Sequence, residues 1–234
     1  MTTRVAKFLS MAGIASRRAA EKMILDGRVK VNGKKIESPA SFVSKDDSVF
    51  VDNAPVIPAK AGTESRIPKI YLFHKPTGCI CSAKDPNGRR TIYDVLPAKY
   101  GNLKYVGRLD YNTSGLLLLT NDGAKARELT LPETGLERTY IAKVGGALTM
   151  DDGMINRLLR PARKGIKIDG IIYRPMKIER LNGSDLKITI TEGKKNEIRK
   201  VFEHIGLPIR KLHRISYGPY ALGALPVGKI TLNP

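Results

Sequence analysis

The residues best suited to chemistry lie in one segment, residues 107–123, which reads GRLDYNTSGLLLLTNDG. Asp110 stands where one apolar pattern stops, and the fully apolar stretch 115–120 follows it. A carboxylate on a short polar loop ahead of a rigid core strand is held in place well enough to react, for example as a nucleophile. Residues 110–114 are also ordinary turn formers. Spacing alone favours the turn, so both interpretations stay open at this point.

Other kinds of site leave no pattern in the sequence. Neither of the glycine-rich nucleotide-binding motifs, GxGxxG and GxxxxGK[ST], is present. His74, His204 and His213 have no metal-ligand spacing. Cys79 and Cys81 are separated by one residue, so in an extended segment they point to opposite faces, which suits neither a disulfide nor a zinc site. We therefore expect no cofactor, no metal and a reducing, cytoplasmic compartment.

The charge of the chain indicates its partner. The 234 residues carry 41 Lys and Arg against 22 Asp and Glu, a net charge of +19, while 41% of the residues are hydrophobic. A folded protein this basic most often binds a polyanion, usually nucleic acid and less often an anionic membrane. No run of about 18 apolar residues, no secretory signal and no basic amphipathic helix with bulky apolar anchors is present, so a membrane partner is disfavoured.

The chain divides near residues 54–68, where three prolines and no hydrophobic period indicate a linker. Before it, the spacing of apolar residues predicts a helix that Gly13 closes, and a second helix over residues 17–26 with Ser16 as its N-cap. Alternating valines, the turn dipeptide Asn32-Gly33 and a strand over residues 48–51 complete a small module, residues 1–60.

The remaining residues, 69–234, predict a strand-rich domain. Strands are expected at 70–73, 115–120, 138–144 and 186–190, and helical segments at 91–96, 123–130, 150–159 and 195–205. Strands mixed with irregularly placed helices indicate an α+β fold with a mixed, mainly antiparallel sheet.

The segment 107–123 closely resembles the central motif of the pseudouridine synthases, in the branch of ribosomal small-subunit and large-subunit enzymes (RsuA/RluB-type). In that family the Asp of this motif is the catalytic residue, which implies that role for Asp110 and reverses the preference for a turn. Four further segments resemble family motifs in the expected order, namely 74–78 (HKPTG), 89–97 (RRTIYDVLP), 137–140 (ERTY) and 212–219 (LHRISYGP). A fifth is 192–200 (EGKKNEIRK), in which Glu197 replaces the Gln of many relatives.

The resemblance implies the reaction and the site. A uridine of RNA is isomerised to pseudouridine, which requires no cofactor, and the target base leaves its stack to be reached. By their motif positions, Tyr140 packs against that base and Arg199 pairs with Asp110. Arg108, beside Asp110, holds the RNA backbone or is structural, and Lys200 is expected to bind RNA. Removal of one partner of a buried pair such as Arg199–Asp110 typically costs about 3–5 kcal/mol.

The small module resembles the RNA-binding domain first named from a small-subunit ribosomal protein, the S-four type. Arg17 and Arg18 follow a helix N-cap, where backbone N–H groups already favour phosphate. The RNA-binding residues expected in this module are Arg17, Arg18, Arg28, Lys30 and Lys34.

The favoured function is a monomeric, cytoplasmic ribosomal RNA pseudouridine synthase. Its overall resemblance is nearest to the large-subunit (RluB-type) members. The substrate is then 23S rRNA or a ribosomal precursor particle, with 16S rRNA as second choice. A catalytically silent RNA-binding factor for ribosome assembly is the alternative of a different class.

Overall fold

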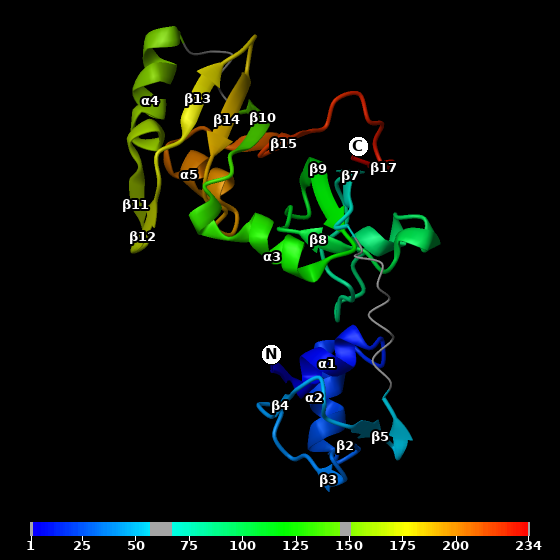
Figure 1. The fold of residues 1–234 in the computed structure, drawn as a ribbon. Helices are drawn as coiled ribbons and strands as arrows, with labels where there is room; N and C mark the ends of the chain where they lie inside the picture. The colour runs from blue at the N-terminus through cyan, green and yellow to red at the C-terminus, as the bar shows by residue number, and fades with distance from the viewer. Residues whose placement is uncertain (1, 57–66, 146–150, 234) are drawn as a thin grey trace. The chain divides into compact units, whose positions relative to one another are not determined.

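The computed structural model describes residues 2–56, 67–145 and 151–233, and the chain forms two units, residues 1–67 and 68–234 (Figure 1). In the first unit, α1 (Val5–Met11) packs on α2 (Arg17–Leu25). A sheet of order β3-β2-β5-β6 lies against them. Its strands are β2 (Val29–Val31), β3 (Lys34–Lys35), β5 (Val49–Val51) and β6 (Ala54–Pro55), and β1 (Thr3–Arg4) pairs separately with β4 (Phe42–Val43).

Local chemistry explains the first unit. The hydroxyl of Ser16 accepts from the backbone N–H of Ala19 at 3.2 Å, which caps α2 as its sequence predicts. Asn32 and Gly33 both have positive φ and form the tight β2–β3 turn. The linker was expected to begin at residue 54, which is wrong, because β6 pairs with β5 and Val56 is buried in the core of this unit. Residues 57–66 of that expected linker lie outside the described residues.

The second unit is organised around a nine-stranded sheet. Its main path runs β13-β14-β10-β15-β9-β7-β17, with β8 beside β9 and β16 beside β15. All pairs are antiparallel except β15–β9. The strands are β7 (Ile70–Lys75), β8 (Lys104–Val106), β9 (Thr113–Thr120), β10 (Arg138–Val144), β13 (Lys177–Arg180), β14 (Asp185–Ile190), β15 (Ile209–Tyr217), β16 (Tyr220–Ala221) and β17 (Ile230–Leu232). The fold is α+β with a mainly antiparallel sheet.

Both faces of this sheet are covered. The leucines of β9 alternate, so that Leu117 and Leu119 join one core while Leu116 and Leu118 join another. The first core includes α4 (Asp152–Lys164) and α5 (Glu197–His204), and the second includes α3 (Gly123–Thr130). The unit also contains a hairpin, β11 (Ile166–Ile168) with β12 (Ile171–Tyr173), and three short 3-10 helices, η1 (Ile92–Asp94), η2 (Ala98–Tyr100) and η3 (Pro132–Thr134).

Several elements differ from their expected bounds, and α4 and β15 show the largest differences. The helix expected over residues 150–159 runs on through Pro161 to Lys164, because Leu159 and Ala162 are buried in the core. Met150, its expected first residue, lies outside the described residues. β15 had no strand prediction, since its alternation is interrupted by register shifts against β10.

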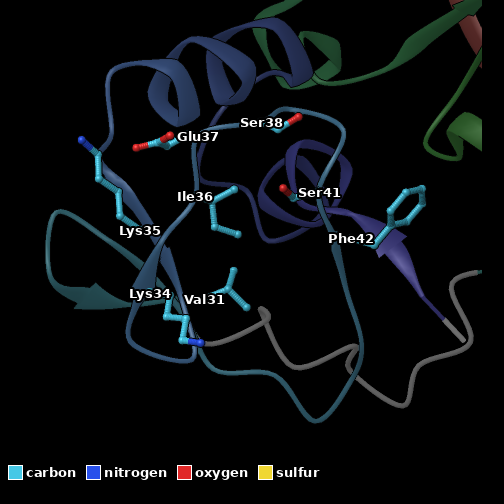
Figure 2. A pocket seen from close by; sticks show the side chains of 8 residues that line it. All are labelled: Val31, Lys34, Lys35, Ile36, Glu37, Ser38, Ser41 and Phe42. Atoms are coloured by element: carbon cyan, nitrogen blue, oxygen red, sulfur yellow. The ribbon is translucent and has the colours of Figure 1, made fainter.

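An open groove of about 630 Å³ lies on the first unit, between the β2–β3 hairpin and the segment leading to β4 (Figure 2). Val31 and Ile36 lie at its centre, and Lys34 and Lys35 line it from the hairpin. Glu37 also lines the groove, so its rim carries charges of both signs. Across the described residues, no helix is long and apolar enough to cross a membrane.

Candidate active site

Asp110 lies half-buried on the loop between β8 and β9. The backbone of this loop is held at four consecutive carbonyl groups, those of residues 110–113. The carbonyl of Tyr111 accepts from the N–H of Gly78 at 2.9 Å, and that of Asn112 accepts from the Arg199 guanidinium at 2.9 Å. Those of Asp110 and Thr113 accept from Nζ of Lys75 at 3.2 and 3.0 Å. Donors from β7, the turn after it and α5 therefore fix the loop, as a reactive carboxylate requires.

Lys75 donates to the Asp110 loop, although the sequence analysis assigned it no role. Its side chain is fully buried at the end of β7 and also donates to the carbonyl of Pro76 at 2.9 Å. Burial lowers the pKa of Lys75, while Cys79, Cys81 and Asp110 oppose that shift. The available signal was a lysine at the end of an otherwise apolar strand, since such a residue needs several acceptors when buried.

Arg199 does not pair directly with Asp110, contrary to expectation. Its guanidinium donates to the carbonyls of Asn112 and Ile209 at 2.9 and 3.1 Å, and the structure records no ion pair for Asp110 within the described ranges. Two donors of the guanidinium are taken instead by these backbone carbonyls, one on the exposed Asn112 of the loop and one on Ile209 of β15. Arg199 thus connects the Asp110 loop to β15 through backbone atoms.

The carboxylate itself contacts Asn196, which directly precedes α5. With its nitrogen turned toward the carboxylate, the orientation in which donors meet acceptors, the Asn196 amide donates to both oxygens of Asp110 at 3.0 Å. Asn196 occupies a variable position of the motif that the sequence resembles, so motif comparison could not identify it.

Tyr140 lies on β10 beside a cluster of buried cations. Tyr140 is 7% exposed, and Cζ of Arg214 lies 6.0 Å from the centroid of its ring. Arg214 and Arg138 lie 5.0 and 4.8 Å from the Tyr217 ring, and Arg138 donates to the Tyr217 hydroxyl at 2.9 Å. Within the described residues these two arginines have no carboxylate partner, so the interior beside Tyr140 is positively charged.

Glu197, the departure from the family pattern, forms a buried pair with Glu192. Burial and then the hydrogen bond with Glu192 raise the pKa of Glu197 to about 8. One carboxylate oxygen of Glu197 accepts from the N–H of Lys194 at 2.8 Å, and the other accepts no donor. The raised pKa favours the protonated form of Glu197, which is the form that can donate to Glu192 as a glutamine amide would at this position.

The remaining basic residues lie at the surface. Arg108 and Lys200 are exposed beside the site. In the first unit Arg17, Arg18 and Lys34 are exposed, whereas Arg28 is paired with Asp52 and Lys30 donates to Asn53. These five residues belong to the first unit, whereas the Asp110 site belongs to the second. In the described part of the chain, no three His, Cys, Asp or Glu side chains form a metal-binding group.

Comparison with known proteins identifies the family. The family model for RNA pseudouridylate synthases matches residues 69–204, and that of the S4 domain matches residues 3–49. The chain belongs to the RNA pseudouridine synthase family. An RNA pseudouridine synthase of Rickettsia felis is 39% identical over 229 residues, which are 96% of this chain and 94% of that protein. The ribosomal large subunit pseudouridine synthase B of Bacillus subtilis is 36% identical over 96% of this chain and 89% of that protein.

A solved structure agrees with this assignment. The crystal structure of a pseudouridylate synthase covers 99% of this chain and 96% of its own, with a TM-score of 0.67 and 27% sequence identity. Membership of the family makes this protein an isomerase with an RNA substrate, built from an S4 domain and a synthase domain.

Proposed function

We propose that this synthase isomerises a specific uridine of ribosomal RNA, in 23S rRNA rather than 16S rRNA, with Asp110 as the catalytic residue. The observation that carries the role of Asp110 is the support of its loop at four consecutive carbonyls together with the amide contact to both carboxylate oxygens. The choice of 23S rRNA is supported by relatives named large-subunit enzymes, including that of Bacillus subtilis.

The isomerisation needs no cofactor, because no group or electron is transferred to or from another molecule. In the isomerisation, the bond between the uracil nitrogen and the ribose breaks, the base turns, and a ring carbon is joined to the same ribose carbon. The carbon loses its proton and the released nitrogen gains one, so atoms and electrons balance. An oriented carboxylate can act as the nucleophile toward the sugar or the ring, or assist elimination at the sugar.

The cations around the site fit an anionic, structured substrate. Arg108 and Lys200 are exposed, and they are the chain neighbours of the Asp110 loop and of Arg199, so we propose that they contact phosphates of the bound strand. The buried Arg138–Tyr217–Arg214 cluster gives the site a positive interior. Tyr140, which is almost fully buried, is proposed to contact the flipped base. The S4 unit, through Arg17 and Arg18, is proposed as a second RNA anchor.

The test is a pseudouridine map of both ribosomal RNAs from cells with the protein, without it, and with Asp110→Asn. The proposal predicts one 23S position that is lost in the deletion and in the variant, while the variant still binds the RNA. A lost 16S position would refute the choice of substrate. A pseudouridine map that is unchanged by the deletion would leave the silent assembly factor as the better explanation, and an active Asp110→Asn protein would refute the role of Asp110.

We also propose that the enzyme acts as a monomer, since the contacts that hold Asp110 come from a single chain. Light scattering of the purified protein, free and bound to RNA, tests this proposal.

A further inference from the structure

The side chain of Asn196 is placed to control the orientation of Asp110. Its amide donates to both carboxylate oxygens at 3.0 Å, so the two side chains form a two-bond contact. Asn196 has φ 54° and ψ 27°, the left-handed conformation that asparagine tolerates better than most residues. Its carbonyl accepts from the N–H of Lys200 at 2.9 Å, which anchors the residue to the first turn of α5.

The charged side chains around Asp110 do not donate to its carboxylate. Lys75, from β7, donates to the backbone carbonyl of Asp110 and not to its carboxylate. Arg199, from α5, donates to the carbonyl of Asn112, and Arg108 of the same loop is exposed. In the described part of the chain, Asn196 is therefore the residue whose donors meet the carboxylate oxygens themselves.

We propose that Asn196 is a positioning residue that orients the Asp110 carboxylate for reaction, an inference that rests on the proposed role of Asp110. An amide satisfies both oxygens without a charge of its own, so it fixes the direction of the carboxylate without neutralising it. Arg199 then acts indirectly, by holding the backbone on which Asp110 is mounted.

Two substitutions at this position separate the side chain from the backbone. Asn196→Asp keeps a residue that tolerates the left-handed conformation, but it removes the donors and places a second carboxylate against Asp110. Asn196→Gly removes the amide and relaxes the backbone requirement entirely. Asn182→Asp is the matched control, because Asn182 lies exposed in a turn between β13 and β14.

The experiment measures single-turnover pseudouridine formation between about pH 4 and pH 9, which includes the titration range of a carboxylate, on ribosomal RNA from cells that lack the protein. We expect Asn196→Gly to lower the rate by about 100-fold at saturating enzyme, as misplacement of a reacting group does. In Asn196→Asp, two adjacent carboxylates cannot both be ionised easily, so the acid limb of the rate profile moves up by about one pH unit or more. A purely structural role would not move this limb.

The outcomes distinguish this inference from the proposed function. Thermal unfolding by circular dichroism first establishes that each variant is folded. If Asn196→Gly reacts at the wild-type rate, or the acid limb of Asn196→Asp coincides with those of the wild type and Asn182→Asp, the positioning role is refuted. An inactive Asp110→Asn enzyme beside such results would leave the proposed function intact, whereas an active one would overturn both.

Discussion

Replacement of Glu197 by glutamine should stabilise the protein in a manner that depends on pH. Glu197 is 3% exposed on the first turn of α5, and its pKa is raised to about 8 by burial and by the hydrogen bond with Glu192. In the unfolded chain the same carboxyl has an ordinary pKa of 4.5. Between these two values the folded protein holds a proton that the unfolded chain has released, so folding becomes less favourable as the pH rises.

The size of the effect follows from this difference. Each pH unit between 4.5 and 8 lowers the free energy of unfolding by at most about 1.4 kcal/mol, and the loss ends above pH 8. A glutamine keeps the donor to Glu192 and the acceptor for Lys194, and it does not titrate. Glu197→Gln should therefore match the wild type near pH 4.5 and exceed its stability by up to about 3 kcal/mol at pH 7.

Urea denaturation at several values between pH 4.5 and pH 9 measures this difference. Glu203→Gln is the matched control, because Glu203 is an exposed carboxylate on the same helix. We expect the curve of Glu203→Gln to follow that of the wild type, and the curve of Glu197→Gln to separate from it steadily up to about pH 8. If the stabilities of Glu197→Gln and the wild type differ by the same amount at every pH, Glu197 does not carry the proton and the reasoning fails.

Three further predictions address the backbone around the site and the S4 unit. Lys75→Met removes the donor to three carbonyls and should lower the free energy of unfolding by about 3 kcal/mol. Urea denaturation measures this change, and a variant as stable as the wild type would contradict the prediction. Gly115→Ala places a Cβ 2.2 Å from a backbone oxygen of β15. This substitution should lower the free energy of unfolding by about 3 kcal/mol or more. Gly88→Ala, where a Cβ meets open space, should lower it by only about 1 kcal/mol, the cost of the left-handed backbone. Equal decreases in melting temperature for the two variants would contradict the close approach at Gly115. Alanine at both Arg17 and Arg18 should reduce the log–log salt slope of ribosomal RNA binding by about 1.4–1.8, and an unchanged slope would exclude phosphate contacts there.

Much of the fold could be predicted because it depends on neighbours in the chain. The cap at Ser16, the Asn32-Gly33 turn and the strand over residues 138–144 arise from contacts within a few residues or from simple alternation. Helix α4 could not be bounded in this way, since a proline inside a helical pattern predicts an end that core packing overrides. β15 escaped prediction because register shifts interrupt its alternation.

The sequence by itself determined the family, the position of Asp110 and the basic character that suits RNA, since these depend on residue types and their order. Tertiary structure decided what surrounds Asp110. Lys75 and Asn112 meet their partners across 35 and 87 residues of chain, and Asn196 reaches Asp110 from the start of α5. Arg199 binds backbone carbonyls rather than the carboxylate, because the fold brings the carbonyls of Asn112 in the loop and Ile209 in β15 within reach of its guanidinium. Such pairings depend on distances and directions that exist only after the sheet and α5 have come together.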